Sequence, residues 1–136
     1  MSAAGFGIAL CSDCWNGVEC VESVLRNPGI GDLTAAIDAL DADVRTLVVV
    51  SGPGESHLAV GGGKGQFVVY ATFDNLTFFN LVHPGAGQGI LAVVAGGQAG
   101  EYPAEQVVGR AEALAAATRF LVDGRLGEDL GWRRQA

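Results

Sequence analysis

The residues of this chain that could perform nucleophilic chemistry are Ser56 and His57, which are adjacent, with Ser51 nearby. A serine becomes a nucleophile when a histidine takes its proton and a third group orients that histidine. The Gly-x-Ser-x-Gly motif, which presents a serine at a strand-to-helix turn, is absent from the sequence. A serine and a histidine this close in sequence often occur by chance. A small hydrolase using Ser56 and His57 is therefore the weakest of our hypotheses.

The cysteines could bind a metal or exchange disulfides only if their number and spacing suited that chemistry. Cys11-x-x-Cys14 lacks the second pair of ligands that a zinc site needs, and Cys20 makes the number odd. A redox motif should open a helix, whereas this one runs toward Asn16-Gly17, which is typical of a hairpin turn. We therefore expect reduced packing residues, no metal site and no cofactor.

Two other segments contain groups that bind ions or phosphates in other proteins. Gly61–Gly65 surrounds Lys64, but a phosphate loop needs an earlier glycine and a following Ser or Thr, and both are missing. Asp38, Asp41 and Asp43 have a spacing compatible with a cation, yet no glycine-bearing loop orders them. The scarcity of reactive residues favours a binding protein over a catalyst, so we expect no enzymatic activity.

Composition narrows the class further. The chain has 136 residues, 49% hydrophobic and 17% charged, which suits one globular domain over residues 1–136. The net charge of −7 argues against direct nucleic-acid binding, because that function normally requires a basic patch. No apolar run is long enough to span a bilayer, and residues 1–10 lack the basic start of a secretory signal. We therefore expect a cytoplasmic protein without a membrane partner.

The N-terminal half predicts a hairpin, a helix and a central strand. Phe6–Trp15 and Val18–Ser23 are expected to pair around Asn16-Gly17, because these two residue types tolerate the positive φ angles of a type I′ turn. Apolar residues at helical spacing predict a helix over about 32–44 with Asp32 as its N-cap. The β-branched run Thr46–Ser51 predicts a buried strand.

The middle of the chain predicts strands. His57–Val60 is a short strand, Gly61–Gly65 a turn, and Phe67–Val82 a strand pair around Asp74-Asn75. A two-residue turn there would place Ala71 opposite Phe78 and Tyr70 opposite Phe79. Both faces of this pair are apolar, so one should pack on the helices and the other should be covered by another element or a partner.

The C-terminal part predicts one more strand, a loop, a helix and a short tail. These are Ile90–Ala95, residues 96–100, a helix over about 104–122 that ends at Asp123-Gly124, and Arg125–Trp132. We expect Leu130 and Trp132 to fold back onto Phe120. The helix should bury one strip of side chains and direct a second strip, Ala113, Ala116 and Phe120, elsewhere. The buried strip is Val107, Ala111, Leu114, Thr118 and Leu121.

The fold class is thus α+β, with an antiparallel sheet of five to seven strands and two main helices. Acidic residues cluster at the C-terminal ends of the two predicted helices, where the helix dipole is unfavourable to negative charge. Each acid there lowers the stability by about a few tenths of a kcal/mol. Either nearby arginines (Arg45, Arg119 and Arg125) compensate these acids, or the acids are held there for a cationic partner. They are Asp41 and Asp43 at the C-terminal end of the first helix, and Asp123, Glu128 and Asp129 around the end of the second.

Several segments together resemble the Imm-one family of immunity proteins from bacterial polymorphic-toxin systems. The closing helix and tail are the most specific of them, and residues 1–30 match poorly. The family usually has a proline after the glycine–arginine pair, where this chain has Leu126-Gly127-Glu128. The matching segments are His57-Leu58-Ala59-Val60-Gly61, Phe67-Val68-Val69-Tyr70, the Asp74-Asn75 turn, Glu101-Tyr102-Pro103, Phe120-Leu121-x-x-Gly124-Arg125 and Leu130-x-Trp132.

The resemblance implies a non-enzymatic antitoxin that binds and neutralises a cognate toxin, often a nucleic-acid deaminase. A deaminase presents a positive groove around its zinc-bound water, and an acidic protein can occupy that groove. Tight binding also needs an apolar or aromatic anchor within a polar rim. We expect that interface at Asp74 and Asn75, with Phe78 or Phe79 as anchor, together with Glu101 and Tyr102. The alternative hypothesis is an adaptor or regulatory module with another protein partner.

Overall fold

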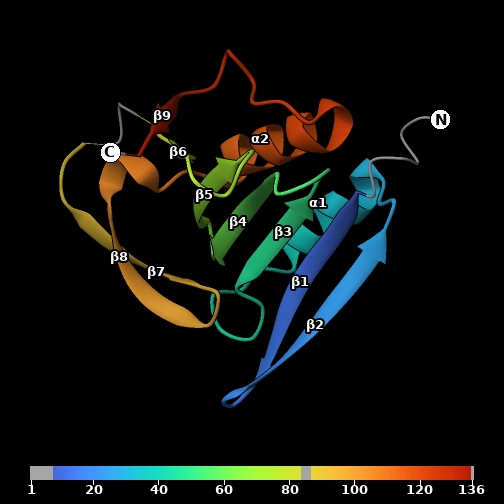
Figure 1. The fold of residues 1–136 in the computed structure, drawn as a ribbon. Coiled ribbons are helices and arrows are strands. Elements are labelled where there is room, and N and C mark those ends of the chain that lie inside the picture. The colour runs from blue at the N-terminus through green and yellow to red at the C-terminus, as the bar shows by residue number, and fades with distance from the viewer. Residues whose placement is uncertain (1–7, 84–86, 136) are drawn as a thin grey trace.

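The computed structural model describes residues 8–83 and 87–135, and its centre is an antiparallel sheet (Figure 1). Seven strands of the described residues form this sheet, in the order β2-β1-β3-β4-β5-β6-β9. Helices α1 and α2 cover one face, and β7 and β8 form a separate hairpin on the other side (Figure 1). The fold is a single α+β domain with two α-helices, as the sequence predicted.

The bounds of the elements follow the order of the chain. They are Ala9–Asn16 (β1), Glu19–Arg26 (β2), Ile30–Asp38 (α1), Leu47–Ser51 (β3), His57–Gly63 (β4), Gln66–Thr72 (β5), Phe78–Leu81 (β6), Ile90–Ala95 (β7), Gln98–Pro103 (β8), a 3-10 turn at Ala104–Gln106, Arg110–Asp123 (α2) and Trp132–Arg134 (β9).

The first hairpin is confirmed, but its turn lies one residue later than predicted. Asn16 pairs with Glu19, so Gly17 and Val18 are the central residues. Gly17 has a φ of 65° and Val18 does not share a positive φ, which is the pattern of a type II′ turn. Of the predicted strand Phe6–Trp15, the first two residues lie outside the described part of the chain.

Helix α1 is shorter than the predicted 32–44. Gly29 is its N-cap, and Asp32 acts from the third helical position by accepting a 2.9 Å hydrogen bond from the Gly29 N–H. The helix ends at Asp38, and the carboxylate of Asp41 then accepts backbone hydrogen bonds from three of the next four residues. Such a side chain offers the backbone a local alternative to the helix. Asp41 and Asp43 therefore lie in a loop and not on a helix end.

The pairing of β5 with β6 differs by one residue from the prediction. Ala71 pairs with Phe79, and Tyr70 pairs with Asn80. The connection is a five-residue loop, 73–77, in which the Asp74 carboxylate accepts hydrogen bonds from the Leu76 and Thr77 N–H groups. A shift of one residue moves every side chain of the second strand to the other face. Phe79, not Phe78, therefore shares a face with Ala71.

Two glycine-rich segments are tight turns within longer hairpins. Strand β4 continues to Gly63, and the turn to β5 is Lys64-Gly65, with φ angles of 55° and 81°. The predicted loop 96–100 is the turn Gly96-Gly97 followed by β8, and both glycines again have positive φ. Two successive positive φ angles match the right-handed twist of paired strands. The sequence pattern therefore located these turns but underestimated the strands around them.

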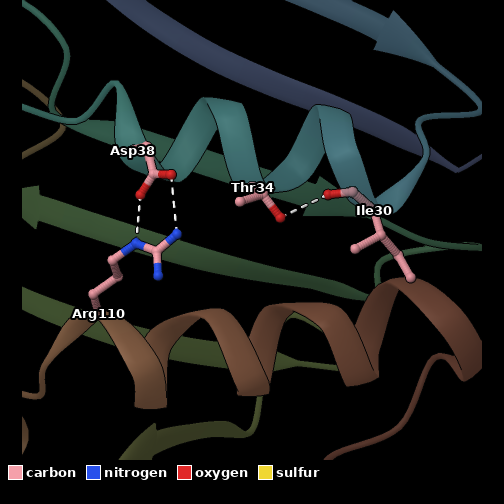
Figure 2. A network of polar contacts seen from close by, with 4 residues as sticks. All are labelled: Ile30, Thr34, Asp38 and Arg110. Carbon is pink, nitrogen blue, oxygen red and sulfur yellow. Dashed lines mark hydrogen bonds and ion pairs between the residues drawn. The ribbon is translucent and has the colours of Figure 1, made fainter.

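The C-terminal helix begins later than the predicted residue 104. Val108 forms a short antiparallel bridge to Phe67, with hydrogen bonds of 2.9 and 2.8 Å in the two directions. Helix α2 starts after this bridge at Arg110 and ends at Gly124, which has a φ of 70°. A bidentate contact from Arg110 to Asp38 ties its start to the end of α1, with distances of 2.6 and 3.0 Å (Figure 2).

The face that α2 buries is the second predicted strip. Ala113, Ala116 and Phe120 are almost completely buried. Of the strip that was predicted to be buried, Leu121 is buried, whereas Ala111 is exposed and Leu114 is half-buried. Alanines let the helix axis lie close to the sheet, and Phe120 fills the space at its end. The tail packs against the same core through Leu126, Leu130 and Trp132. Its last residues pair with β6 as strand β9, which the sequence analysis did not predict.

Candidate partner-binding surface

The sheet face opposite the helices, here called the open face, carries the candidate surface. The pairing registers align one residue from each strand into a row across it. Most of these side chains are half-buried or exposed, and Ala59 is fully buried. The face is therefore apolar but only partly covered. The row is Val24, Cys11, Val49, Ala59, Tyr70, Asn80 and Arg133.

Three aromatic rings gather at the middle of the open face. Tyr70 lies 5.9 Å from His57 in an edge-to-face arrangement at 83°, and 5.9 Å from Phe78 at 54°. His57, Tyr70 and Phe78 are half-buried and come from three neighbouring strands, so their backbone positions are set by the ladder. We name them the aromatic cluster. Large rings that are rigid and partly exposed are typical anchors of protein interfaces.

A small cavity of about 70 Å³ lies between the aromatic cluster and the β7–β8 hairpin. Tyr70 and Tyr102 line it, together with the polar side chains of Asn80 and Gln106. Burial raises the pKa of the Tyr70 hydroxyl, and the nearby Tyr102 adds to the effect. The Tyr70 phenol thus stays neutral at physiological pH and can donate a hydrogen bond to a partner.

The β7–β8 hairpin is attached to the sheet at its tip. The Gly97 N–H donates a 2.8 Å hydrogen bond to Thr46 Oγ1, and a Cβ at Gly97 would overlap the Trp15 ring. Further along, a Cβ at Gly61 would overlap Ala95. These close contacts fix the height of the hairpin above the open face. The cavity is therefore formed before any partner binds.

A buried carboxylate holds that attachment together. Asp13 accepts hydrogen bonds from the Trp15 indole N–H at 2.8 Å and from the Thr46 and Leu47 backbone N–H groups at 2.7 and 2.9 Å. The Thr46 hydroxyl also donates to Asp13 and accepts from Gly97. A buried carboxylate is tolerated because these donors replace its water. The sequence analysis did not identify this network, since its members are far apart in the chain.

The structure brings together some of the predicted interface residues. Phe78 belongs to the aromatic cluster, and Tyr102 faces the same cavity as Tyr70. Glu101 is exposed on β8 and projects from the opposite face of the hairpin to Tyr102. Phe79 lies on the other face, where its ring is 6.4 Å from that of Phe73. The alternation of Val68, Tyr70 and Thr72 along β5 was the signal that could have added Tyr70 to the prediction.

The remaining predicted residues lie outside the aromatic cluster. Asp74 and Asn75 are exposed in the β5–β6 loop, and hydrogen bonds from the Thr77 and Leu76 N–H groups hold the pKa of Asp74 below its usual value. Asp74 therefore organises its own loop. Asn75 has a φ of 61°, a left-handed conformation that asparagine tolerates.

The acids after α2 are partly compensated. Asp123 pairs with Arg119 at 2.8 Å and accepts a 3.1 Å hydrogen bond from the Arg125 N–H. Glu128 and Asp129 are exposed in the tail. Asp123 thus follows the interpretation in which nearby arginines offset the unfavourable helix dipole. The other interpretation, in which acids are held for a cationic partner, then concerns only Glu128 and Asp129 among these three residues.

The residues considered for catalysis or metal binding do not assemble in the described part of the chain. There, Ser56 donates to the Pro53 carbonyl at 2.6 Å, the His57 ring contacts the Glu55 carbonyl at 3.1 Å, and no hydrogen bond joins the two side chains. Cys11 and Cys14 project to opposite faces of β1, because they are three residues apart on a strand. No group of three possible metal ligands occurs in the described residues.

The three cysteines differ in their exposure. The three cysteines, all within the described ranges, are unpaired with one another. Burial raises the pKa of the Cys11 thiol, and the nearby Glu22 carboxylate raises it further. A raised pKa makes a thiolate nucleophile scarcer at neutral pH. Cys11 and Cys14 are half-buried, as expected of packing residues, whereas Cys20 is exposed and is not one.

Comparisons with known proteins give one family match. No helix among the described residues combines the length and apolar character needed to cross a membrane. No curated protein and no solved structure gave a significant match. The sequence model of the family described as Immunity protein Imm1 matches residues 24–134, which include α1, α2 and every strand from β3 onward. Since this match covers most of the chain, the protein belongs to the Imm1 (Imm-one) family of immunity proteins.

Proposed function

We propose that this protein neutralises a cognate toxin by binding it through the open face of the sheet. The observation that carries the proposal is the aromatic cluster, which is rigidly placed by three strands yet only half-buried. Such a surface costs stability unless a partner completes its burial. Membership of the Imm1 family supports a toxin as that partner.

The proposed interface has an anchor, a rim and a charged surround. Phe78 and Tyr70 are the anchor, because their rings lie together on the open face and Tyr70 lines the cavity. Tyr102 and Glu101 supply hydrogen-bonding and acidic groups on the neighbouring hairpin. Phe79 is not part of this proposal, since it packs on the helix side of the sheet.

The acids farther away act at longer range in this proposal. Asp74 and Asn75 lie at the loop end of β5 and β6, Asp123 is the last residue of α2, and Glu128 and Asp129 lie beyond it. With a net charge of −7, the chain would attract a basic toxin and speed its association. The steering would weaken with salt, because the screening length is about 8 Å at physiological ionic strength.

The toxin we propose is a nucleic-acid deaminase, and the mode of inhibition is occlusion of its active site or substrate groove. Such an enzyme must admit a flipped or single-stranded base to a zinc-bound water, so its mouth is open and positive. An acidic surface with a central aromatic anchor complements that mouth in shape and charge. The protein would then protect by exclusion, without chemistry of its own.

The test is co-expression with the toxin, reading cell survival and co-purification. We expect Glu101→Lys together with Asp74→Lys to reduce both, because residue 101 would then repel the positive groove at the rim and residue 74 would no longer attract the toxin at longer range. Glu19→Lys together with Asp43→Lys makes the same total charge change on the outer strand and in the loop after α1, away from the aromatic cluster, and serves as the matched control. Full protection and co-purification by the double variant would remove this surface from consideration.

A further inference from the structure

The outer edge of β2 is the least protected part of the sheet. All eight residues of this strand are exposed, including Val21 at 62%, Val24 at 59% and Leu25 at 44%. Among the described residues no strand pairs with this edge, and β2 is the outermost strand of the sheet (Figure 1). Open edges of this length template pairing with another strand unless charge, proline or shortness prevents it.

The opposite end of the sheet shows those protections. Strand β9 has only three residues, and Arg133 and Arg134 are exposed on it. A short edge that carries like charges resists pairing. Strand β2 contains neither proline nor lysine, and its two acids are balanced by the arginine at its end only in part. The two edges of the sheet therefore differ, since β9 is protected against pairing with another strand and β2 is not.

The backbone groups that point outward from β2 can be identified. The Asn27 N–H donates a 2.9 Å hydrogen bond inward to the Ile8 carbonyl. Because N–H and C=O directions alternate along an antiparallel strand, the residues at even positions point their backbone groups outward. Glu22, Val24 and Arg26 thus present free donors and acceptors at the edge. Their side chains all lie on the open face, in register with Asp13, Cys11 and Ala9.

The charges along this edge are arranged symmetrically about Val24. Glu22 is two residues before it, and Arg26 is two residues after it. An antiparallel copy of the same strand, related by a two-fold axis through Val24, would place Glu22 opposite Arg26 twice. The two Val24 side chains would then be adjacent, and Val21 would lie diagonally across from Leu25 on the other face. A strand complements itself in this way only if its charges have this symmetry.

We propose that β2 pairs with β2 of a second copy of this chain, centred on Val24, to form a two-fold dimer with one continuous sheet. A symmetric dimer buries the same patch on both subunits and closes on itself, which also blocks further edge growth. The pairing goes beyond toxin binding, since most of β1 and β2 precedes residue 24, where the family match begins. The aromatic cluster lies several strands away and stays accessible in both copies.

The test is sedimentation or light scattering of the isolated full chain over a range of concentrations, in reducing buffer so that Cys20 cannot form disulfides. We expect twice the mass of one chain at high concentration. Glu22→Arg alone and Arg26→Glu alone each oppose like charges twice per dimer, so each should raise the dissociation constant by about tenfold or more. The double variant Glu22→Arg/Arg26→Glu restores opposite charges and should recover the dimer.

Glu55→Arg, an equal charge change on an exposed loop, is the control and should leave the dimer intact. Circular dichroism establishes that each variant is folded. Because the two single variants change different residues, each tests the charge pairing separately. A monomeric wild type, or a dimer indifferent to both single variants, overturns the proposal. Failure of the double variant to recover the dimer overturns the pairing about Val24. If the wild type is monomeric and the single variants instead lose toxin co-purification, the edge serves the toxin and self-pairing is wrong.

Discussion

The two faces of the main sheet are both apolar, but they are covered in different ways. On the helix face, Val48, Val50 and Leu58 are at most 1% exposed beneath α1 and α2. On the open face, Val49, Tyr70 and Phe78 remain half-buried beside a narrow hairpin. Neighbouring residues of one strand therefore experience different surroundings. The first set contributes to folding, and the second set retains apolar area that a partner can still bury.

The elements that cover the two faces, the helices on one and the β7–β8 hairpin on the other, are held in place by different interactions. The helices are held by packing of many apolar side chains, which is a cooperative and non-directional interaction. The β7–β8 hairpin is held chiefly at its tip, through Asp13, Thr46 and Gly97. Directional polar contacts can fix a small element in place without covering the whole face. This arrangement leaves the aromatic cluster open and holds its surroundings rigid.

The largest effect is expected on the helix face. Phe120→Ala removes a ring that is 2% exposed and should lower the free energy of unfolding by about 4 kcal/mol. Urea denaturation would measure the loss. Toxin affinity, measured at a low temperature where the variant is still folded, should be unchanged. A loss below about 1 kcal/mol would mean that this face is less tightly packed than its burial indicates.

The attachment of the hairpin should rank second. Asp13→Ala removes the acceptor for four hydrogen bonds and leaves buried donors unsatisfied, at a cost of about 3 kcal/mol. The Gly97 amide should exchange hydrogen faster than in the wild type, because its acceptor Thr46 is no longer oriented. Asp13→Asn keeps one acceptor oxygen and should show a smaller change. Unaltered exchange at Gly97 in both variants would separate the hairpin from this network.

Two consecutive phenylalanines provide the sharpest comparison of the faces. Phe78→Ala should weaken toxin binding by about 2 kcal/mol, roughly 30-fold, with a smaller loss of stability. Phe79→Ala should lower stability by about 2 kcal/mol through lost packing with Phe73 and leave affinity unchanged. Calorimetric titration and urea denaturation of both variants give the result. Equal effects on affinity would contradict the assignment of the two rings to different roles.

The smallest effect concerns acid pH. Backbone hydrogen bonds, first from Arg45 and then from Asp43 and Val44, hold the pKa of Asp41 below its ordinary value of 3.8. Because the pKa is lower in the folded state, Asp41 stabilises the protein above about pH 4, and this stabilisation is lost as the pH falls through the folded value. Asp41→Asn should therefore lose less stability than the wild type between neutral and acid pH. Parallel losses in urea midpoint would exclude Asp41 as a source of acid sensitivity.

The sequence predicted most of the elements where a local pattern was strong. The apolar run within Gln66–Thr72 and the glycine-rich turns located the strands, and the helical spacing of Leu33 and Ile37 located α1. The errors occurred where a side chain ended or offset an element. Asp41 shortened the first helix, and Asp74 lengthened a turn by binding the backbone beyond it. These effects depend on which donor a carboxylate reaches, which the residue type alone does not reveal.

The outcome of the interface prediction depended on the one-residue shift in the pairing of β5 with β6. Phe78 lies against Tyr70 because β6 pairs with β5 one residue away from the predicted register, and Tyr102 shares a cavity with Tyr70 because a hairpin distant in sequence lies over the sheet. The tail strand β9 could not be inferred from its three residues, since pairing with β6 requires the rest of the sheet. The Asp13 network joins residues more than thirty positions apart and leaves no local signal.

The order of residues along the chain was enough for the α+β class, the acidic character and the resemblance to immunity proteins, because periodicity, charge and short motifs are local properties. The choice between Phe78 and Phe79, the rotation of α2 and the exposure of the aromatic cluster required the packed molecule. The physical reason is that a strand has two nearly equivalent faces, and only the register with its neighbours and the position of the helices distinguishes them. On this chain that distinction separates the buried core from the surface proposed to meet the toxin.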